Sequence, residues 1–332
     1  MIALALLAAT AAIPQPTELK LFKDWTVGCD NGLSCQAVAL MPEDMPEGFA
    51  TMSLSRGAEA DAAPIVRITL EGEGAAGLAA DGRKLDAKLT KDDGAARVEP
   101  AGMPAVLAAL RSAARLDVLN ARGEKIGTVS LAGASAALLF IDERQKRIGT
   151  TGALVRPGPA APSRMPPALP IVQAARVATG KPHALGPARV EALRKAQGCE
   201  IEEVGGPDEV EVHLLDGHRS LVLLACGSGA YNVTTVPLVA EGSGADMKIA
   251  PAKFDRMESW WENGQPMLVN AGWEAATSSL GSFSKGRGLG DCGTSQYYVW
   301  DGAMFRLVEQ SEMGECRGST DYITTWRALV RR

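Results

Sequence analysis

The stretch WTVGCDNGLSC, residues 25–35, decides how the fold begins. Its apolar residues Trp25, Val27 and Cys29 alternate with smaller or polar neighbours, and this period of two predicts a half-buried β-strand. The dipeptide NG that follows is typical of a hairpin turn. When Cys29 and Cys35 lie on the two paired strands, a disulfide can clamp the hairpin at a short Cα distance.

The other four cysteines form two further neighbouring couples, Cys199 with Cys226 and Cys292 with Cys316. An even number of cysteines behind an export-like leader favours structural disulfides, because disulfides persist only in oxidising compartments. The chain-entropy model assigns about 3.5 kcal/mol to each wide couple and about 2.4 kcal/mol to the short one. We therefore expect three disulfides that reinforce the fold, each within one half of the chain.

The first twelve residues, MIALALLAATAA, have the length of a signal-peptide h-region and end in an A-x-A cleavage site. We expect residues 1–12 to be a signal peptide and the mature protein to be periplasmic or secreted. No basic n-region precedes the apolar run, so the true start codon lies further upstream or the leader is uncharged. The alternative is a buried N-terminal helix in a cytosolic protein. No later segment is apolar over the ~18 residues of a membrane span, so no transmembrane segment is expected after cleavage.

Composition excludes one large class of partner and sets the number of domains. With 34 basic and 39 acidic residues, the chain lacks the strongly basic face that nucleic-acid binding requires. Its 332 residues predict two domains of ordinary size. The proline-rich segment 156–170 favours extended, semi-rigid chain and is expected to link them. We expect a β-sandwich-like domain with two helices over 17–155 and a disulfide-containing β-rich domain over 171–332.

Further periodic segments predict a mainly β fold with a few helices, of the α+β class. In the first half, strands are predicted at 65–70, 116–120 and 126–131, and helices at 104–115 and 134–147. In the second half, Pro187 and Gly198 bracket a predicted helix. A hairpin is predicted around Asp216-Gly217, with residue 215 opposite residue 218, and antiparallel strands are expected to dominate this half.

The tryptophans of the second half are candidate ligand-binding residues. Trp260, Trp261, Trp273 and Trp300 could stack on sugar rings or anchor a partner, because aromatic side chains bury a large area at low entropic cost. The simpler interpretation is that they belong to the core. Trp260 and Trp261 cannot both face inward on one strand, because successive side chains point to opposite faces.

The glycine-rich run KGRGLGDCG, residues 285–293, is a second candidate, with Arg287 and Asp291 as the residues it would present to a ligand. It leads toward a predicted strand rather than a helix, so it is not a dinucleotide fingerprint. The simpler interpretation is a loop that needs unusual backbone angles. His213 and His218 flank a turn, but no third ligand is identifiable, and we expect no metal and no cofactor.

Several motifs together resemble a family of exported bacterial proteins catalogued as a domain of unknown function, DUF1176. The resemblance is carried by residues 25–32 with Cys35, residues 286–293, Trp300-Asp301-Gly302, Phe305, Cys316-Arg317-Gly318 and Trp326-Arg327-Ala328. It implies an exported protein with a β-sandwich-like first domain and supplies no catalytic residue. The first half, with Ser130-Leu131-Ala132-Gly133 leading into a helix, is also similar to the invasion-associated locus B proteins.

The sequence assembles no nucleophile, base and orienting group, so a non-enzymatic binding or interaction module of the cell envelope is the leading hypothesis. Its partner would be an envelope protein or a glycan. One alternative is a hydrolase of envelope polymers that uses carboxylates such as Asp291 and Glu262 near the tryptophans. Another is thiol redox chemistry at Cys292.

Overall fold

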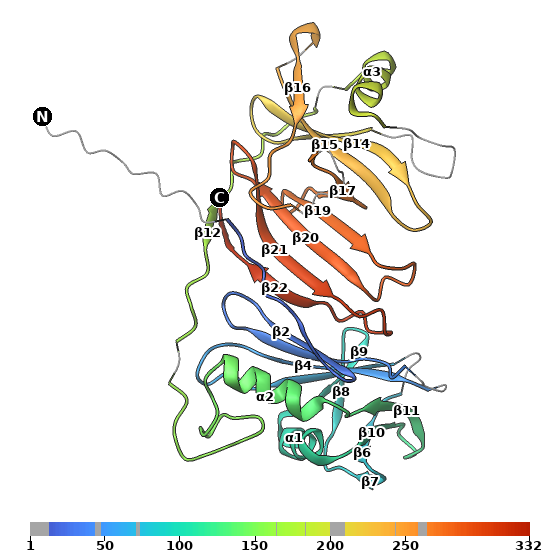
Figure 1. Ribbon diagram of the computed structural model, residues 1–332, viewed down its shortest axis with the longest axis vertical. Coiled ribbons are helices and arrows are strands. Elements are labelled where there is room, and N and C mark those ends of the chain that lie inside the picture. The colour runs from blue at the N-terminus through green and yellow to red at the C-terminus, as the bar shows by residue number, and fades with distance from the viewer. Residues whose placement is uncertain are drawn as a thin grey trace, which may run out of the picture.

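The computed structural model describes residues 13–43, 48–70, 74–163, 165–182, 184–199, 210–242, 244–257 and 264–332. These residues form four antiparallel sheets, stacked along the long axis of the molecule, and one short parallel pair of strands (Figure 1). The described chain contains the α-helices α1 (Met103–Ser112), α2 (Ala134–Arg144) and α3 (Pro187–Gln197). The prediction of a mainly β protein with a few helices is confirmed. The predicted signal peptide, residues 1–12, lies outside the described residues.

A seven-stranded antiparallel sheet forms the first large layer. In spatial order its strands are β1 (Lys20–Phe22), β2 (Trp25–Cys29), β3 (Cys35–Ala39), β4 (Ala50–Arg56), β5 (Ile65–Leu70), β9 (Ala95–Val98) and β8 (Leu89–Asp92). The predicted hairpin of residues 25–35 is the pair β2–β3, and Cys29 lies directly opposite Cys35.

Helices α1 and α2 and a four-stranded sheet cover one face of this sheet (Figure 1). The four strands are β11 (Lys125–Ser130), β10 (Arg115–Leu119), β6 (Gly77–Ala80) and β7 (Arg83–Lys84), and a 3₁₀ turn, η1 (Pro100–Gly102), precedes α1. Trp25, Ile68, Leu116 and Leu138 meet in the core between the layers. This is the β-sandwich-like arrangement with two helices that the sequence predicts.

Residues close in the sequence explain where α1 and α2 begin. Pro104 stands in the first turn of α1, where its missing N–H is not needed. Gly133, with φ 97°, caps the start of α2, and a Cβ there would lie 1.8 Å from the carbonyl oxygen of Phe22. Only glycine fits so close an approach. Helix α2 ends at Arg144, three residues before the predicted end.

Two five-stranded sheets form the C-terminal part, with a core that includes Leu221, Leu280, Tyr298 and Phe305 between them. The first contains β13 (Val210–Leu214), β14 (Arg219–Ser228), β15 (Val233–Glu241), β16 (Lys248–Pro251) and β17 (Leu268–Val269), with the 3₁₀ turn η2 (Gly244–Asp246) before β16. The second contains β18 (Gly272–Glu274), β19 (Ser279–Lys285), β20 (Gly293–Trp300), β21 (Phe305–Met313) and β22 (Ile323–Arg327).

Strand β2 corrects one prediction, because all five of its residues are buried rather than half-buried. Strand β22 packs on the face of β2 and β3 that points away from the helices. A Cβ on Gly28 would lie 2.6 Å from Leu19 and 3.0 Å from Ile323, so glycine lets these side chains approach. The alternating pattern therefore predicted the strand correctly but not its burial. The face expected to be exposed to solvent is covered by β22, which is distant in the sequence.

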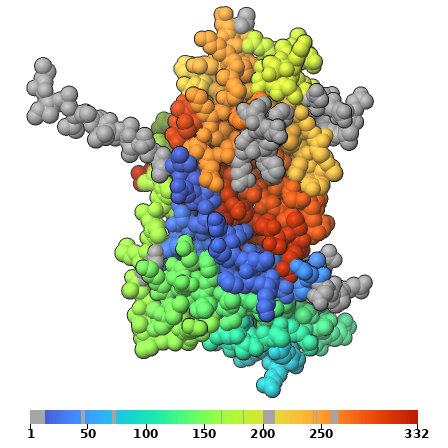
Figure 2. Space-filling view, viewed as in Figure 1, coloured from blue at the N-terminus to red at the C-terminus, as the bar shows by residue number. Residues whose placement is uncertain are grey.

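Polar contacts also join the two parts of the chain at this junction, where C-terminal residues lie directly against N-terminal residues (Figure 2). The Arg317 guanidinium donates to the Asp24 carboxylate at 2.6 Å and to the carbonyl oxygen of Met41 at 2.7 Å. Arg327 donates to Asp30, and Asn31 donates to the carbonyl oxygen of Arg327. The interface is thus specified by charge-assisted bonds as well as by apolar packing.

The proline-rich segment leads into β12 (Ile171–Gln173), which pairs in parallel with β23 (Leu329–Arg331). Leu169, near its end, packs so closely on Gly32 that a Cβ there would lie 2.8 Å from it. At the start of the segment, the carbonyl oxygen of Arg156 accepts the N–H of Gly149 at 2.9 Å, so both ends are held. The division into two domains stays a prediction.

Two turns differ from their predictions in detail. In the β2–β3 hairpin, the residue with positive φ is Leu33, at 65°, and the Asp30 carboxylate organises the loop by accepting the N–H groups of Gly32 and Ser34. In the β13–β14 hairpin, residue 214 pairs with residue 220, so residue 215 does not face residue 218. The loop is longer than the two-residue turn that the Asp-Gly dipeptide predicts, because the Asp216 side chain caps it.

Candidate functional site

All six cysteines form disulfides, in the pairs expected from their order. Cys29 is bonded to Cys35, Cys199 to Cys226 and Cys292 to Cys316, and no cysteine carries a free thiol. A disulfide sulfur is not a resting nucleophile. The suggested thiol chemistry at Cys292 therefore has no thiolate to start from.

In the glycine-rich loop, Arg287 and Asp291 bond to each other. Arg287 donates from Nε to Asp291 at 2.7 Å, and the N–H of Gly318 donates to the same carboxylate at 2.7 Å. The hydrogen bond from Arg287 holds the pKa of Asp291 below its ordinary value. Burial, with a further effect of Asp291, raises the pKa of neighbouring Tyr322 to about 12. The arrangement fixes the loop and keeps Asp291 ionised.

The candidate tryptophans have different surroundings. Trp300 is 4% exposed, and its indole N–H donates to the Asp216 carboxylate at 3.0 Å, which leaves little surface for a ligand. Trp273 is half-buried and stacks on His213 with ring centroids 5.8 Å apart. Trp260, Trp261 and Glu262 lie outside the described residues. Among the described candidates, the structure thus does not bring Trp273 and Trp300 into one site.

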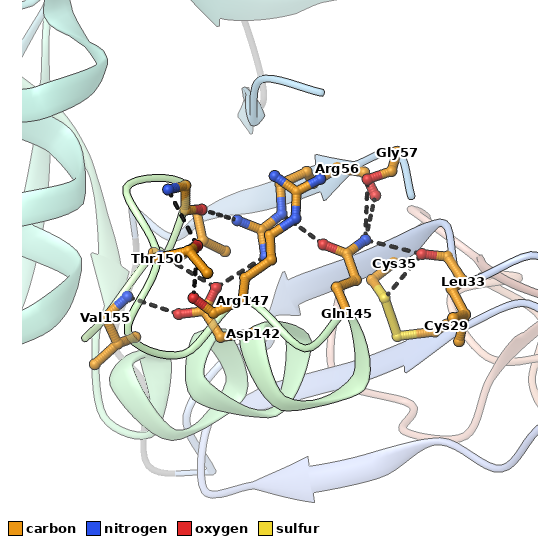
Figure 3. A network of polar contacts seen from close by, with 12 residues as sticks. Cys29, Leu33, Cys35, Arg56, Gly57, Asp142, Gln145, Arg147, Thr150 and Val155 are labelled. Carbon is orange, nitrogen blue, oxygen red and sulfur yellow. Dashed lines mark hydrogen bonds and ion pairs between the residues drawn. A yellow bond between two sulfur atoms is a disulfide. The ribbon is translucent and has the colours of Figure 1, made fainter. Parts of the chain in front are cut away.

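Helix α2 carries a buried polar network that sequence reasoning missed (Figure 3). Arg56 donates to the Asp142 carboxylate at 2.8 Å and to the side-chain oxygen of Gln145 at 2.7 Å. Asp142 also accepts the N–H groups of Leu154 and Val155, each at 2.9 Å. Burial lowers the pKa of Arg56, and its bond to Asp142 opposes this effect. Since the groups bond one another, the network holds α2 against the sheet and offers nothing to a ligand.

A different arrangement lies on the outer face of the sheet β18–β22, the face that points away from the core. There a hollow of about 280 Å³ is lined by Asn270, Gly272, Trp273, Glu274, Gly281, Ser282, Phe283, Ser295 and Tyr297. Gly272 faces Gly281 across the paired strands, and Gly281 in turn faces Tyr297. The two glycines have no side chains to fill this space, so the floor of the hollow is bare backbone.

Tyr297 is the most exposed aromatic side chain of this hollow. A Cβ on Gly281 would lie 3.3 Å from its ring, so the ring leans over the glycine, yet the residue stays 43% exposed. Phe283 stands beside it and makes an edge-to-face contact with Tyr322 at 5.5 Å. Aromatic rings with a free face beside hydroxyl and amide groups are typical of shallow recognition sites. Of the described residues predicted for ligand binding, Trp273 borders this hollow, whereas Trp300, Arg287 and Asp291 do not.

No metal centre is found in the described ranges, where no group of three or more His, Cys, Asp and Glu side chains could hold an ion. The His213 ring contacts the Glu211 carboxylate at 2.9 Å and stacks on Trp273. His183 lies outside the described residues. In the same described chain, no helix is long and apolar enough to cross a membrane.

The chain belongs to the protein family described as "Protein of unknown function (DUF1176)", whose model matches residues 19–330. The family resemblance seen in the motifs is thereby confirmed. The chain is also 30% identical, over 356 aligned positions, to the "Uncharacterized protein YpfG" of Escherichia coli (strain K12). That alignment covers 97% of this chain and 96% of the relative. No solved structure matches. The similarity of the first half to invasion-associated locus B proteins stays a prediction.

Proposed function

We propose that the protein is an exported binding module of the bacterial cell envelope, and that it binds a glycan on the outer face of the sheet β18–β22. The observation that carries this proposal is the hollow beneath and beside Tyr297. It combines a partly exposed ring, a backbone floor left open by two glycines, and polar side chains at the rim. Three disulfides support export, since such bonds persist in oxidising compartments such as the periplasm or the exterior.

The enzymatic alternatives have less support. A glycoside hydrolase needs a carboxylic acid with a raised pKa to protonate the leaving group. The pKa of Asp291 is lowered instead, because Arg287 bonds to it. Among the described carboxyls, burial raises the pKa of Asp255, but this residue accepts the N–H of Leu307 and lies away from the hollow.

Binding of the purified mature protein to a glycan array, followed by titration calorimetry with the glycans retained, tests the proposal. Tyr297→Ala is expected to weaken binding about tenfold, which corresponds to about 1.4 kcal/mol of lost contact. Tyr231→Ala is the matched control, since Tyr231 is 41% exposed but bonds to Gly286 outside the hollow. Turnover of a cell-wall polymer without any Tyr297-dependent binding would contradict the proposal.

A further inference from the structure

Two carboxylates flank Tyr297 on the outer face of the sheet. Glu309 on β21 lies directly opposite Tyr297 on β20, and directly opposed residues of an antiparallel pair point to the same face. Their Cβ atoms are therefore about 5 Å apart. On the other side, Glu274 lines the hollow itself. The ring thus stands between one acidic side chain from β18 and another from β21.

Neither carboxylate is neutralised by a neighbour in the described structure. Glu309 is exposed and makes no ion pair, and Glu274 accepts only the backbone N–H of Ala276, at 2.9 Å. Arg327, opposite Glu309 on β22, directs its guanidinium to Asp30 and to Ser34. Lys285 lies over the ring of Phe283, 5.8 Å from its centroid. Both carboxylates are therefore available to a ligand.

An exposed aromatic ring with a carboxylate on each side favours a positively charged ligand. The face of an aromatic ring attracts an ammonium group, with about 0.5–1 kcal/mol at exposed sites. A carboxylate on each side of the ring adds to that attraction, whereas a neutral sugar gains only stacking and hydrogen bonds. An anionic sugar would be repelled by both acids. The charges around Tyr297 thus distinguish between glycans that would stack on it equally well.

We infer that the glycan carries free amino groups, so that the ligand of this site is a cationic amino sugar rather than a neutral or acidic one. This inference rests on the proposed glycan-binding function and refines it. The sugar ring lies against Tyr297 above the glycine floor. Glu274 and Glu309 stand three strand spacings apart, so each pairs with the ammonium group of a different sugar along the chain. Recognition then depends on three side chains with separate roles: one stacks and two pair with charge.

Titration calorimetry with two oligosaccharides of equal length tests the inference, with a β-1,4-linked glucosamine hexamer as the cationic probe and its fully N-acetylated counterpart as the neutral one. At pH 6 and low salt, the cationic hexamer is expected to bind at least about tenfold more tightly. Glu274→Gln and Glu309→Gln should each weaken its binding about threefold and leave binding of the N-acetylated hexamer unchanged. Tyr297→Ala should weaken binding of both.

The control variant is Glu241→Gln, which removes an exposed carboxylate from a different sheet, at the end of β15. It is expected to bind both hexamers as the wild type does. Equal affinity for the two hexamers, with Tyr297 still required, would overturn the amino-sugar inference and leave glycan binding intact. Failure of both hexamers and of every glycan on the array would overturn glycan binding itself. A tetralysine peptide that binds more tightly than the cationic hexamer would overturn the saccharide assignment.

Discussion

The buried network at α2 and the outer face of the sheet β18–β22 both contain charged groups, but they leave those groups in opposite states. Within the network, Asp142 receives the Arg56 guanidinium and two backbone N–H groups, so its capacity to accept hydrogen bonds is used inside the protein. On the outer face, Glu309 has no ion-pair partner among the described residues, and Glu274 accepts one backbone N–H. Charged residues satisfied by the fold hold it together, whereas unsatisfied ones beside an exposed ring remain available for binding.

The two regions should therefore respond differently to mutation. Removing one member of the network leaves its partner buried and uncompensated, and this destabilises a protein strongly. Removing an exposed, unpaired carboxylate leaves nothing uncompensated and changes stability little. The experiments below compare the loss of stability caused by substitutions in the two regions.

The largest loss of stability is expected for Asp142→Ala, which leaves the Arg56 guanidinium buried without its carboxylate. We expect the free energy of unfolding to fall by about 3–5 kcal/mol in urea titrations. Asp92→Ala is the control, since Asp92 also pairs with an arginine, Arg67, at 2.8 Å but on the surface. An equal loss in both variants would contradict the distinction between buried and exposed pairs.

A slightly smaller loss is expected when the Cys292–Cys316 disulfide is removed. The double variant Cys292→Ser with Cys316→Ser should lose about 3.5 kcal/mol, and Cys29→Ser with Cys35→Ser only about 2.4 kcal/mol, because the shorter loop constrains the unfolded chain less. Urea midpoints of the two double variants under identical conditions give the comparison. The reverse order would show that native-state contacts outweigh loop entropy.

A pH-dependent effect is expected at Asp291, where Arg287 lowers the carboxyl pKa from its ordinary value of 3.8. The stability contributed by this carboxylate is present above pH 3.8 and is lost as the pH falls through the lower pKa of the folded state. Asp291→Asn should therefore be less stable than the wild type at pH 7, and this difference should shrink below pH 3.8. Asp246→Asn, at an exposed position, serves as the control. Unfolding curves of both proteins, measured from pH 7 to below pH 3.8, test this prediction. A stability difference that stays constant with pH would contradict it.

The smallest change of stability is expected on the outer face. Glu274→Gln combined with Glu309→Gln should leave the free energy of unfolding within about 0.5 kcal/mol of the wild type, because no bond within the described fold depends on either charge except the one to Ala276. The same double variant should lose its preference for the cationic hexamer. A loss of stability comparable to that of Asp142→Ala would assign the two glutamates to the fold rather than to binding.

Local patterns predicted many elements well. Strand 65–70 occurs with the predicted bounds, and the helix after Pro187 ends where Gly198 adopts φ 68°, as its position predicts. The hairpin of residues 25–35 and its disulfide also followed from neighbouring residues. These features succeed because turn chemistry, helix capping and a period of two depend on residues close in the sequence.

Features that depend on distant residues were not predicted. The full burial of β2 needs Ile323 of β22, and the partners of Arg56 lie 86 and 89 positions away. The exposed ring beside the hollow, by contrast, could have been predicted from the sequence. The alternation argument that separates Trp260 from Trp261 also predicts one outward ring in the pair Tyr297-Tyr298, and the structure exposes Tyr297 while it buries Tyr298.

The junction between β2 and β22 also governs the order in which the molecule can form. Asn31 and Arg327, whose groups bond there, are separated by 296 positions. Such distant pairings close only after a large loss of chain entropy, so they form late and slow the completion of folding. Until Ile323 and Arg327 arrive, the outer side of the first hairpin stays exposed. A chain that crosses a membrane N-terminus first would therefore expose this apolar surface until its last strands have followed, which is when a chaperone would be needed most.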